Sequence, residues 1–519
     1  MTIARIGSYY IRNEIFQFKA RLDDEHIIDQ ICLEYVSNDD KYEYKMEFKQ
    51  NGREISAKIH LDMINWKQQE WNIKADGIRF VYDGKISKLA SCLLFYNDYY
   101  RPDAKHIVCT AINVDKSVAL HYRQAGKYEG FGFKMKERAA LVTSILMGPF
   151  LKRKPIIIIY EKFSATAQDN GYYLFKYCME NKVESRYNCK IYYSIDKRAK
   201  DYLNVAEYGD HVLDFMSFRY LNRVLNAKLL VSTDSKGHAY PTQFYGGFLQ
   251  AFIRRKPLVF LQHGVTAFKR VDFLYGKKSY GTCNRFIVTS DFEKKIVEEN
   301  FGYCTKEIPV TGFARWDVLK DKSSDRREIL VCPTWRKWLE DVDTDTFIKS
   351  TFYKTYTELL SSDKLAQVLE KHDVVLNFYL HTKFKEYLND FKLASDKIKL
   401  IPFGSVPLNE LIMSSGLLIT DYSSVAWDAY YIGHPVIFYQ FDVEQYLTEH
   451  GSYIDFEKEL FGERVTDEGV EVLVNKIEDQ IRTGFELSKA ARDRKDYYFA
   501  YTDNNNCARI LDVIGEFLN

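Results

Sequence analysis

The 519-residue sequence predicts an α/β protein in which two parallel sheets follow a small all-β domain. From residue 155 onward, short β-rich runs alternate with segments of helix length, which is the pattern of wound parallel sheets. Residues 416–442 have the order strand, hydroxyl-rich turn, helix and strand, one unit of such a sheet. Before residue 125, apolar and charged side chains alternate instead. We therefore predict three domains, at residues 1–125, 126–312 and 313–519.

The first of these domains is predicted to be a β-sandwich. Apolar side chains alternate with charged ones over residues 42–48 and again over 55–61, and Asn51-Gly52 between them favours a hairpin turn. Further strands are expected at residues 71–73, 78–82 and 106–111. No residue cluster in this domain indicates catalysis, so we interpret it as an accessory module. Roles as an adaptor, in homo-oligomer formation and in contact with an acceptor polymer stay open.

The two predicted parallel sheets follow in series. Helices are expected at residues 171–180 and 291–301, a linker at 311–325, and a last helix at 496–518 that crosses back to the first sheet. The predicted strands are residues 156–160, 190–194, 228–232, 258–261 and 286–289 in the first sheet and 329–332, 374–380, 398–401, 417–420 and 436–439 in the second.

The turn within residues 416–442 is the first candidate site. Ser423 and Ser424 follow a predicted buried strand and stand where a helix begins. In an open parallel sheet, ligands bind beyond the carboxyl ends of the strands, and a helix N-terminus offers free N–H groups to a phosphate. An isolated Asp-Tyr-Ser-Ser sequence is more often a simple helix cap, but the longer context favours a phosphate site.

Three further motifs also follow predicted strands. His263 and Gly264 follow residues 258–261; imidazole can take the proton of an attacking hydroxyl near neutral pH, so we predict His263 as a general base. Thr334 and Arg336 follow residues 329–332, and an arginine fork suits a diphosphate. His381 ends the run 374–380 and is predicted to face the same phosphates.

The run ITDYSSVAWDAYYIGHPVIFYQFDVEQY closely resembles the donor-site signature of the CDP-glycerol glycerophosphotransferase family, the teichoic-acid and capsule polymerases and primases of bacterial envelopes. The segments around His263, Thr334 and His381 resemble family motifs too, except that Gln262 replaces a common Trp and Thr382 a common Pro. The resemblance covers residues from about 155 to the end and is strongest over 263–456. It implies a GT-B fold, with two Rossmann-like domains facing a cleft and the nucleotide donor held by the C-terminal one.

The resemblance also implies roles for individual residues. His263 and His381 would be catalytic, Asp421 would shape the turn, and Asp428 would bind a polyol hydroxyl. Gly264, Lys269 and Arg270 would contact the acceptor. Donor-binding residues would be Thr334, Arg336, His381, Thr420, Asp421, Ser423, Ser424 and Asp428.

Composition narrows the classes of partner. Lysine and arginine number 73 against 72 aspartate and glutamate, a net charge of +1, so nothing global indicates nucleic-acid binding. The nine cysteines form no CxxC pair or metal-spaced cluster, so we expect reduced thiols, no metal and no cofactor. The start of the chain lacks the pattern of a leader, and no apolar run approaches the roughly 20 residues that span a bilayer. We therefore expect a cytoplasmic protein.

Residues 133–154 join the first two predicted domains and combine an apolar helical stretch with flanking basic residues. A buried linker helix and a helix lying on a membrane surface fit this segment equally well. The basic-aromatic segments 215–223 and 248–256 slightly favour the membrane surface, on the inner face of the bacterial cell membrane.

The expected reaction transfers glycerol phosphate or ribitol phosphate from CDP-glycerol or CDP-ribitol to a hydroxyl of a lipid-linked polyol-phosphate or saccharide acceptor, with release of CMP. Two alternatives stay open. One is a GT-B glycosyltransferase that uses a nucleotide-sugar. The other is a non-catalytic envelope scaffold that keeps the fold.

Overall fold

The protein was analysed as a computed structural model, which describes residues 2–37, 40–67, 69–82, 99–113, 115–151, 153–240, 248–323, 325, 327–340, 342–380, 384, 387, 390–466 and 468–518. The chain forms two compact units. The first contains residues 1–153, 213–227 and 236–256, and the second contains 154–212, 228–235 and 257–519. Both predicted parallel sheets therefore belong mainly to one unit, and the domain boundaries near residues 125 and 312 stay a prediction.

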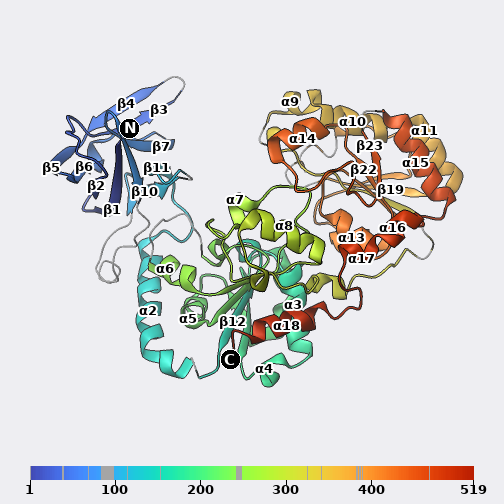
Figure 1. Cartoon of the computed structure of the whole chain (residues 1–519), viewed down its shortest axis with the longest axis horizontal. Coiled ribbons are helices and arrows are strands. Elements are labelled where there is room, and N and C mark those ends of the chain that lie inside the picture. Colours follow the sequence, from blue (N-terminus) through green and yellow to red (C-terminus); the bar gives the residue numbers. More distant parts are fainter. Residues whose placement is uncertain are drawn as a thin grey trace. The chain divides into compact units, whose positions relative to one another are not determined.

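The N-terminal part of the first unit is the predicted sandwich of two sheets (Figure 1). Its core buries side chains of both sheets, among them Phe18, Leu33 and Trp71. The strand orders are β5-β6-β2-β1-β8 and β4-β3-β7-β11-β10-β9. The strands are β1 (Thr2–Arg12), β2 (Ile15–Leu22), β3 (Cys32–Val36), β4 (Lys41–Lys45), β5 (Glu47–Asn51), β6 (Glu54–His60), β7 (Gln69–Lys74), β8 (Ile78–Tyr82), β9 (Tyr99–Tyr100), β10 (His106–Ile112) and β11 (Val118–Gln124).

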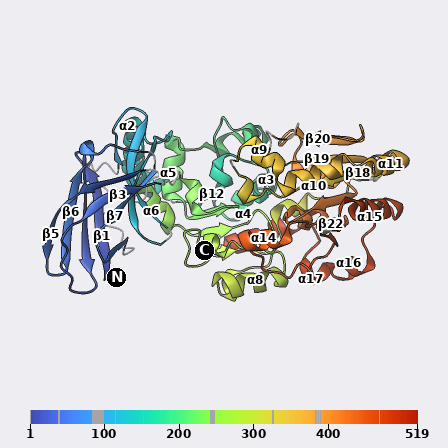
Figure 2. The same ribbon diagram turned by 90° about the horizontal axis from the view of Figure 1, so that it is seen from above.

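The predicted strand at residues 42–48 is two strands. β5 pairs with β6 across the Asn51-Gly52 turn, as predicted, whereas β4 pairs with β3 in the other sheet. The break falls at Met46, whose N–H donates to Ile31 O at 2.8 Å and whose side chain is buried. The alternating residues 42–48 are thus divided between two sheets. The alternation alone does not show this division. Figure 2 shows β5 and β6 side by side at one edge of their sheet.

Within the described residues, the first unit has three α-helices: α2 (Phe131–Leu151), α5 (Phe218–Asn226) and α6 (Phe248–Arg255). α2 packs along α5, and the Asn226 side-chain amide donates to Ser144 Oγ at 2.7 Å. No described helix is both long and apolar enough to cross a bilayer.

The two parallel sheets of the second unit share one topology. Their strand orders are β14-β13-β12-β15-β16-β17 and β20-β19-β18-β21-β22-β23, so each has the Rossmann order 3-2-1-4-5-6 in its own numbering. The strands are β12 (Ile156–Tyr160), β13 (Lys190–Ile195), β14 (Val212–Asp214), β15 (Leu229–Ser232), β16 (Leu258–Phe260), β17 (Arg285–Phe286), β18 (Glu328–Val331), β19 (Val375–Tyr379), β20 (Ile398–Ile401), β21 (Leu417–Thr420), β22 (Val436–Tyr439) and β23 (Glu463–Val465).

The helices of the second unit connect these strands. The predicted last helix at residues 496–518 is two helices, α17 and α18, because the polar run 501–506 interrupts the apolar pattern. α18 packs on α3, on the side of the first sheet, as predicted (Figure 1). The helices are α3 (Asn170–Glu180), α4 (Val183–Arg186), α7 (Asp272–Tyr275), α8 (Asp291–Phe301), α9 (Thr344–Lys349), α10 (Thr351–Leu360), α11 (Asp363–His372), α12 (Leu408–Ser414), α13 (Val425–Tyr431), α14 (Val443–His450), α15 (Val470–Arg482), α16 (Lys489–Asp493), α17 (Lys495–Tyr498) and α18 (Asn506–Gly515).

Candidate functional site

The candidate site lies at the switch point of the second sheet, where strand order reverses between β18 and β21. The loop after β18 carries Thr334, and the loop after β21 carries Asp421. One carboxylate oxygen of Asp421 accepts the N–H of Thr334 at 2.8 Å and the N–H of Tyr422 at 2.6 Å. Asp421 is fully buried, so it holds the two loops together from beneath.

Arg336 lies beneath the site rather than on its surface. Its side chain is 0 % exposed, and its guanidinium contacts Asp421 at 2.8 Å and Asp442 at 2.7 Å and donates to Thr334 O at 2.6 Å. Burial lowers the pKa of Arg336, but Asp421 and Asp442 outweigh that effect and raise it. The direct diphosphate contact that the sequence predicted for Arg336 does not fit this geometry, because the fork is buried against carboxylates.

Two other predicted donor contacts are also buried and bonded to the protein. Thr420 Oγ1 donates to Cys332 O at 2.6 Å, so this hydroxyl joins β21 to the end of β18. Asp428 accepts from Arg315 Nη2 at 2.9 Å and from Trp316 Nε1 at 2.6 Å. The polyol contact that the sequence predicted for Asp428 is therefore replaced by a buried ion pair.

Three hydroxyls remain where a ligand could meet them. Thr334 Oγ1 is buried yet has no hydrogen-bond partner in the described part of the chain. Ser423 and Ser424 are partly exposed at the start of α13, and Ser424 makes no side-chain capping bond. The positive end of the helix dipole and the free N–H groups of a first turn favour an anion at this position. These hydroxyls form a candidate phosphate site.

The loop after β16 presents His263 and is held by buried polar groups. Asn170 Nδ2 donates to Gln262 O at 2.9 Å, and Gln262 Nε2 donates to Glu293 Oε1 at 3.0 Å. Gln262 has a φ of 59°, a left-handed conformation that costs a non-glycine residue energy, so these bonds fix a strained turn. The next residue, His263, is exposed. Gln262 therefore supports this loop from inside the fold.

Gly264 brings this loop against α13 of the other sheet. A Cβ atom added at Gly264 would lie 2.3 Å from Ser424 Oγ and 2.7 Å from Ser424 Cβ. Only glycine fits such a close approach without a shift of the serine. The predicted base and the candidate phosphate site are thus neighbours in space, although 160 residues separate Gly264 from Ser424 in the sequence.

We expect Gly264→Ala to destabilise the protein by about 1–3 kcal/mol, the usual cost of overpacking. Thermal unfolding measures the change. Because the clash is with the side chain of Ser424, Ser424→Gly should restore most of the lost stability in the Gly264→Ala background while doing little alone. Equal losses in the single and the double variant would contradict the proximity of the two residues.

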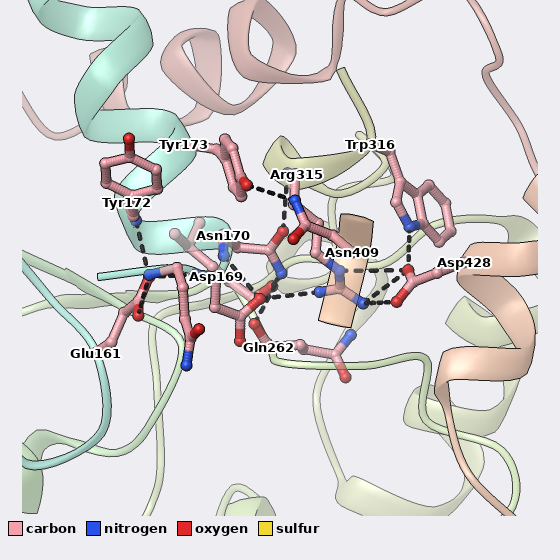
Figure 3. Close-up of polar contacts among 12 residues, drawn as sticks. Glu161, Asp169, Asn170, Tyr172, Tyr173, Gln262, Arg315, Trp316, Asn409 and Asp428 are labelled. Atoms are coloured by element: carbon pink, nitrogen blue, oxygen red, sulfur yellow. Dashed lines mark hydrogen bonds and ion pairs between the residues drawn. The ribbon is translucent and has the colours of Figure 1, made fainter. Parts of the chain in front are cut away.

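A buried polar network connects the two sheets (Figure 3). Arg315 donates to Asp169 at 3.0 Å and to Asp428 at 2.9 Å, and its backbone N–H donates to Asn170 Oδ1 at 3.1 Å. Burial raises the pKa of Asp169, and the charges of Arg315 and His263 oppose that rise.

Glu161 lies in the same network, directly after β12 (Figure 3). Its carboxylate accepts the N–H groups of Asp169 and Tyr172, each at 2.9 Å. Burial, followed by the negative charge of Asp169, raises the pKa of Glu161 to about 7. Glu161 thus caps the turn that leads into α3 and positions Asp169.

The predicted acceptor residues Lys269 and Arg270 lie on the same loop as His263. Lys269 Nζ lies 5.2 Å from the centre of the Trp335 ring, and the Arg270 guanidinium lies 5.3 Å from that of Tyr453. The backbone N–H of Arg270 donates to His450 O at 3.3 Å. This loop therefore crosses from the first sheet to the end of α14 in the second.

Some predicted site residues lie outside the described part of the chain, and some residues of the site were not predicted. His381 and Thr382 lie outside the described residues. In the part of the chain that is described, no group of three or more His, Cys, Asp or Glu side chains is arranged to hold a metal ion. Sequence reasoning overlooked Asp442, although it lies within the quoted signature run. The network residues Glu161, Asp169, Asn170 and Arg315 were also not predicted. For Asp169, Asn170 and Arg315 the reason is that their partners across the network are distant in sequence.

Comparison with known proteins identifies the family. The model of the CDP-Glycerol:Poly(glycerophosphate) glycerophosphotransferase family matches residues 142–516, well over half of the chain. The chain belongs to this family. The resemblance drawn from the sequence motifs is thereby confirmed.

Individual members of the glycerophosphotransferase family resemble the chain with less than 30% sequence identity. The minor teichoic acid biosynthesis protein GgaB of Bacillus subtilis is 28% identical over 459 residues, which cover 85% of this chain and 49% of GgaB. A teichoic acid poly(glycerol phosphate) polymerase of Bacillus spizizenii is 27% identical over 340 residues, which cover 59% of this chain and 80% of the polymerase. The chain thus spans about half the length of GgaB.

A solved structure of the wall teichoic acid polymerase TagF supports the fold of this glycerophosphotransferase family member. It matches with a TM-score of 0.54 at 17% identity, over 75% of this chain and 95% of that chain. The predicted fold class, two Rossmann-like parallel sheets preceded by an all-β domain, is confirmed by the sheets themselves and by this likeness.

Proposed function

We propose that the protein transfers a polyol phosphate, glycerol phosphate or ribitol phosphate, from a CDP-linked donor to a hydroxyl of a lipid-linked acceptor. The observation that carries this proposal is the close approach of Gly264 to Ser424, which brings the loop of His263 next to the start of α13, the proposed phosphate site, in a member of a CDP-glycerol transferase family. GgaB and the Bacillus spizizenii polymerase are named for teichoic acid synthesis, which favours this class of product.

In the proposed reaction, the acceptor oxygen attacks the phosphorus next to the polyol, and the bond from that phosphorus to the CMP oxygen breaks. A new phosphodiester forms and CMP leaves with its phosphate. Thr334, Ser423 and Ser424 hold the diphosphate, and His263 takes the hydroxyl proton. Asp169 supports the charge that His263 then carries. Arg336 and Asp421 act indirectly by fixing the loop of Thr334, and His381 keeps the donor-side role that its motif implies.

A donor screen tests the proposal. The purified protein is incubated with CDP-glycerol, CDP-ribitol and a set of nucleotide-sugars, together with a soluble acceptor, and the released nucleotide is identified. Release of CMP from a CDP-polyol supports the proposal. Release of CDP or UDP from a nucleotide-sugar would support a glycosyltransferase instead, and release of no nucleotide would support a non-catalytic scaffold.

We further propose that α2 lies on the surface of an anionic bilayer, where a lipid-linked acceptor would be reached. One face of α2, including Ala140, Leu141 and Ser144, is buried. The opposite face exposes large apolar side chains at helical spacing: Val142 (56%), Ile145 (64%), Leu146 (69%) and Phe150 (58%).

The sequence offered three segments for the membrane surface, 133–154, 215–223 and 248–256, and the proposal keeps α2 from the first. The basic-aromatic segment 215–223 is mostly buried within α5 and the turn before it, so it offers little surface to lipid. Lys136 and Arg153 flank the apolar face of α2, while Lys152 lies outside the described residues. Apolar side chains flanked by basic ones are typical of helices that lie in a membrane interface.

We expect the triple variant Ile145→Ser, Leu146→Ser and Phe150→Ser to bind anionic liposomes at least tenfold more weakly than the wild type. Each side chain loses roughly 1 kcal/mol of favourable transfer, since about 25 cal/mol is gained per Å² of apolar surface buried. Co-sedimentation at several salt concentrations measures both the apolar and the electrostatic contribution.

The matched control for the liposome experiment is Leu203→Ser, which removes an equally exposed leucine (79%) from the second unit. It should bind liposomes as the wild type does. If the triple variant and the control bind equally well, α2 is not the membrane surface. Activity on a soluble acceptor should be retained in both.

A further inference from the structure

Two lysines, a histidine and two indoles gather where the loop after β16 meets the loop after β18 and the end of α14. We call this group, Lys269, Lys337, His450, Trp335 and Trp338, the Lys269 cluster. Lys269 Nζ lies 5.2 Å from the centre of the Trp335 ring. The ring of His450 lies 6.2 Å from that of Trp335 and 6.0 Å from that of Trp338.

The Lys269 cluster carries positive charge that no carboxylate balances at close range. Within the described part of the chain, neither Lys269 nor Lys337 forms an ion pair or hydrogen bond with an acidic side chain. Burial, followed by the charge of Lys337, lowers the pKa of Lys269; Glu340 opposes this with a smaller effect. Burial, followed by the charges of Lys269, Arg336 and Lys337, lowers the pKa of His450 to about 4.

Such an arrangement is unfavourable for the protein alone. Like charges repel, and a partly buried ammonium loses hydration without gaining an ion pair in return. A bound anion would remove both penalties. All five side chains keep some exposed surface, with Lys337 the most open, so a ligand can reach them from solvent.

We propose that the Lys269 cluster is a subsite for a phosphate ester, bound by Lys269 and Lys337 with the two indoles packing against the carbon atoms beside it. The resemblance gave Lys269 an acceptor role; the geometry adds Lys337, His450 and the indoles and specifies a phosphate group. Indole faces suit the CH groups of a polyol or the face of a base, and ammonium groups suit a phosphate as point charges.

The cluster adjoins the candidate phosphate site at Ser423. The ring of His450 lies 4.9 Å from that of Tyr446, which stacks on Tyr422 at 3.6 Å, and Ser423 follows Tyr422 in the chain. The inference rests on the proposed function only for the identity of the ester, which is either the donor diphosphate or a phosphodiester of the acceptor polymer.

Calorimetry with two probes tests the subsite and distinguishes the two sources. The probes are CDP, which represents the donor, and a nucleotide-free oligo(glycerol phosphate), which represents the acceptor. The variants are Lys269→Gln, Lys337→Gln and the double variant of the full chain. We expect each single change to weaken binding of one probe about tenfold, since hydrogen bonds to charged groups are worth roughly 1.5–3 kcal/mol.

A loss confined to CDP assigns the subsite to the donor, and a loss confined to the oligomer assigns it to the acceptor. Unchanged binding of both probes in the double variant overturns the inference. Lys354→Gln, which removes an exposed lysine from α10, is the charge-matched control and should bind both probes normally. Lys337→Arg should also bind both probes normally, because the subsite needs a positive charge and does not depend on the shape of the group that carries it.

Two further measurements separate a binding role from a structural one. The Gln variants should unfold at the same temperature as the wild type or higher, because they remove an unbalanced charge. In nuclear magnetic resonance titrations, the pKa of His450 should rise when the bound probe is present, and a pKa that stays near 4 at saturation overturns the inference. Because no turnover is required, a protein that binds phosphate esters here but releases no CMP would contradict the proposed function alone.

Discussion

His263→Ala is expected to lower turnover with a CDP-polyol donor by about a hundredfold or more, because general-base catalysis usually contributes 10²–10⁴ in rate. The affinity for CDP should change little, since the proposed phosphate contacts are those of Thr334, Ser423 and Ser424. Initial rates at saturating donor measure the first effect, and calorimetry with CDP measures the second.

The control for this variant is His60→Ala, which removes a partly exposed histidine from the N-terminal sandwich and should leave turnover unchanged. A His263→Ala protein that binds CDP poorly yet turns over normally at saturation would contradict the role of general base. It would assign the imidazole to donor binding instead.

Arg336→Met is expected to destabilise the protein by about 3–5 kcal/mol, because removal of one partner from a buried ion pair leaves the other charge unpaired. Here Asp421 and Asp442 would both remain buried, and the loop of Thr334 would lose the N–H···O contact from Nη1. Chemical denaturation measures the loss of stability. CDP binding should weaken only as far as the loop of Thr334 is displaced, because Arg336 itself does not contact the donor in this geometry.

Arg327→Met is the matched control, since the ion pair between Arg327 and Asp373 is 58% exposed on both sides and should contribute at most about 1 kcal/mol. If Arg336→Met proves as stable as this control and fails only to bind CDP, then Arg336 reaches the ligand in solution, as the sequence first suggested.

Much of the fold could be predicted because parallel strands are buried on both faces and therefore appear as short apolar runs. The strands at residues 156–160, 398–401, 417–420 and 436–439 have the predicted bounds. β14 and β23 were missed, because three-residue edge strands have too few side chains to show a pattern. The strands β1 and β2 were also not predicted, because they mix apolar residues with arginine and lysine.

The candidate site was predicted at the level of loops but not of atoms. The motifs correctly placed His263, Thr334 and Ser424 beyond strand ends, and the contact between Gly264 and Ser424 brings two of those motifs together. The sequence did not reveal which charged side chains are bonded within the fold, because the ion-pair partners of Arg336 and Asp428 lie more than 80 residues away. A buried charge and a ligand-binding charge have the same letter in a sequence.

Arg315 has a consequence for how the second unit moves. It belongs to the connection between the two sheets, and its guanidinium holds Asp169 on one side and Asp428 on the other. Pulling the sheets apart would strip a buried cation of one carboxylate, a cost of several kcal/mol. We therefore expect the two sheets to rotate relative to each other about Arg315 when a donor enters. They should not move apart at this side chain.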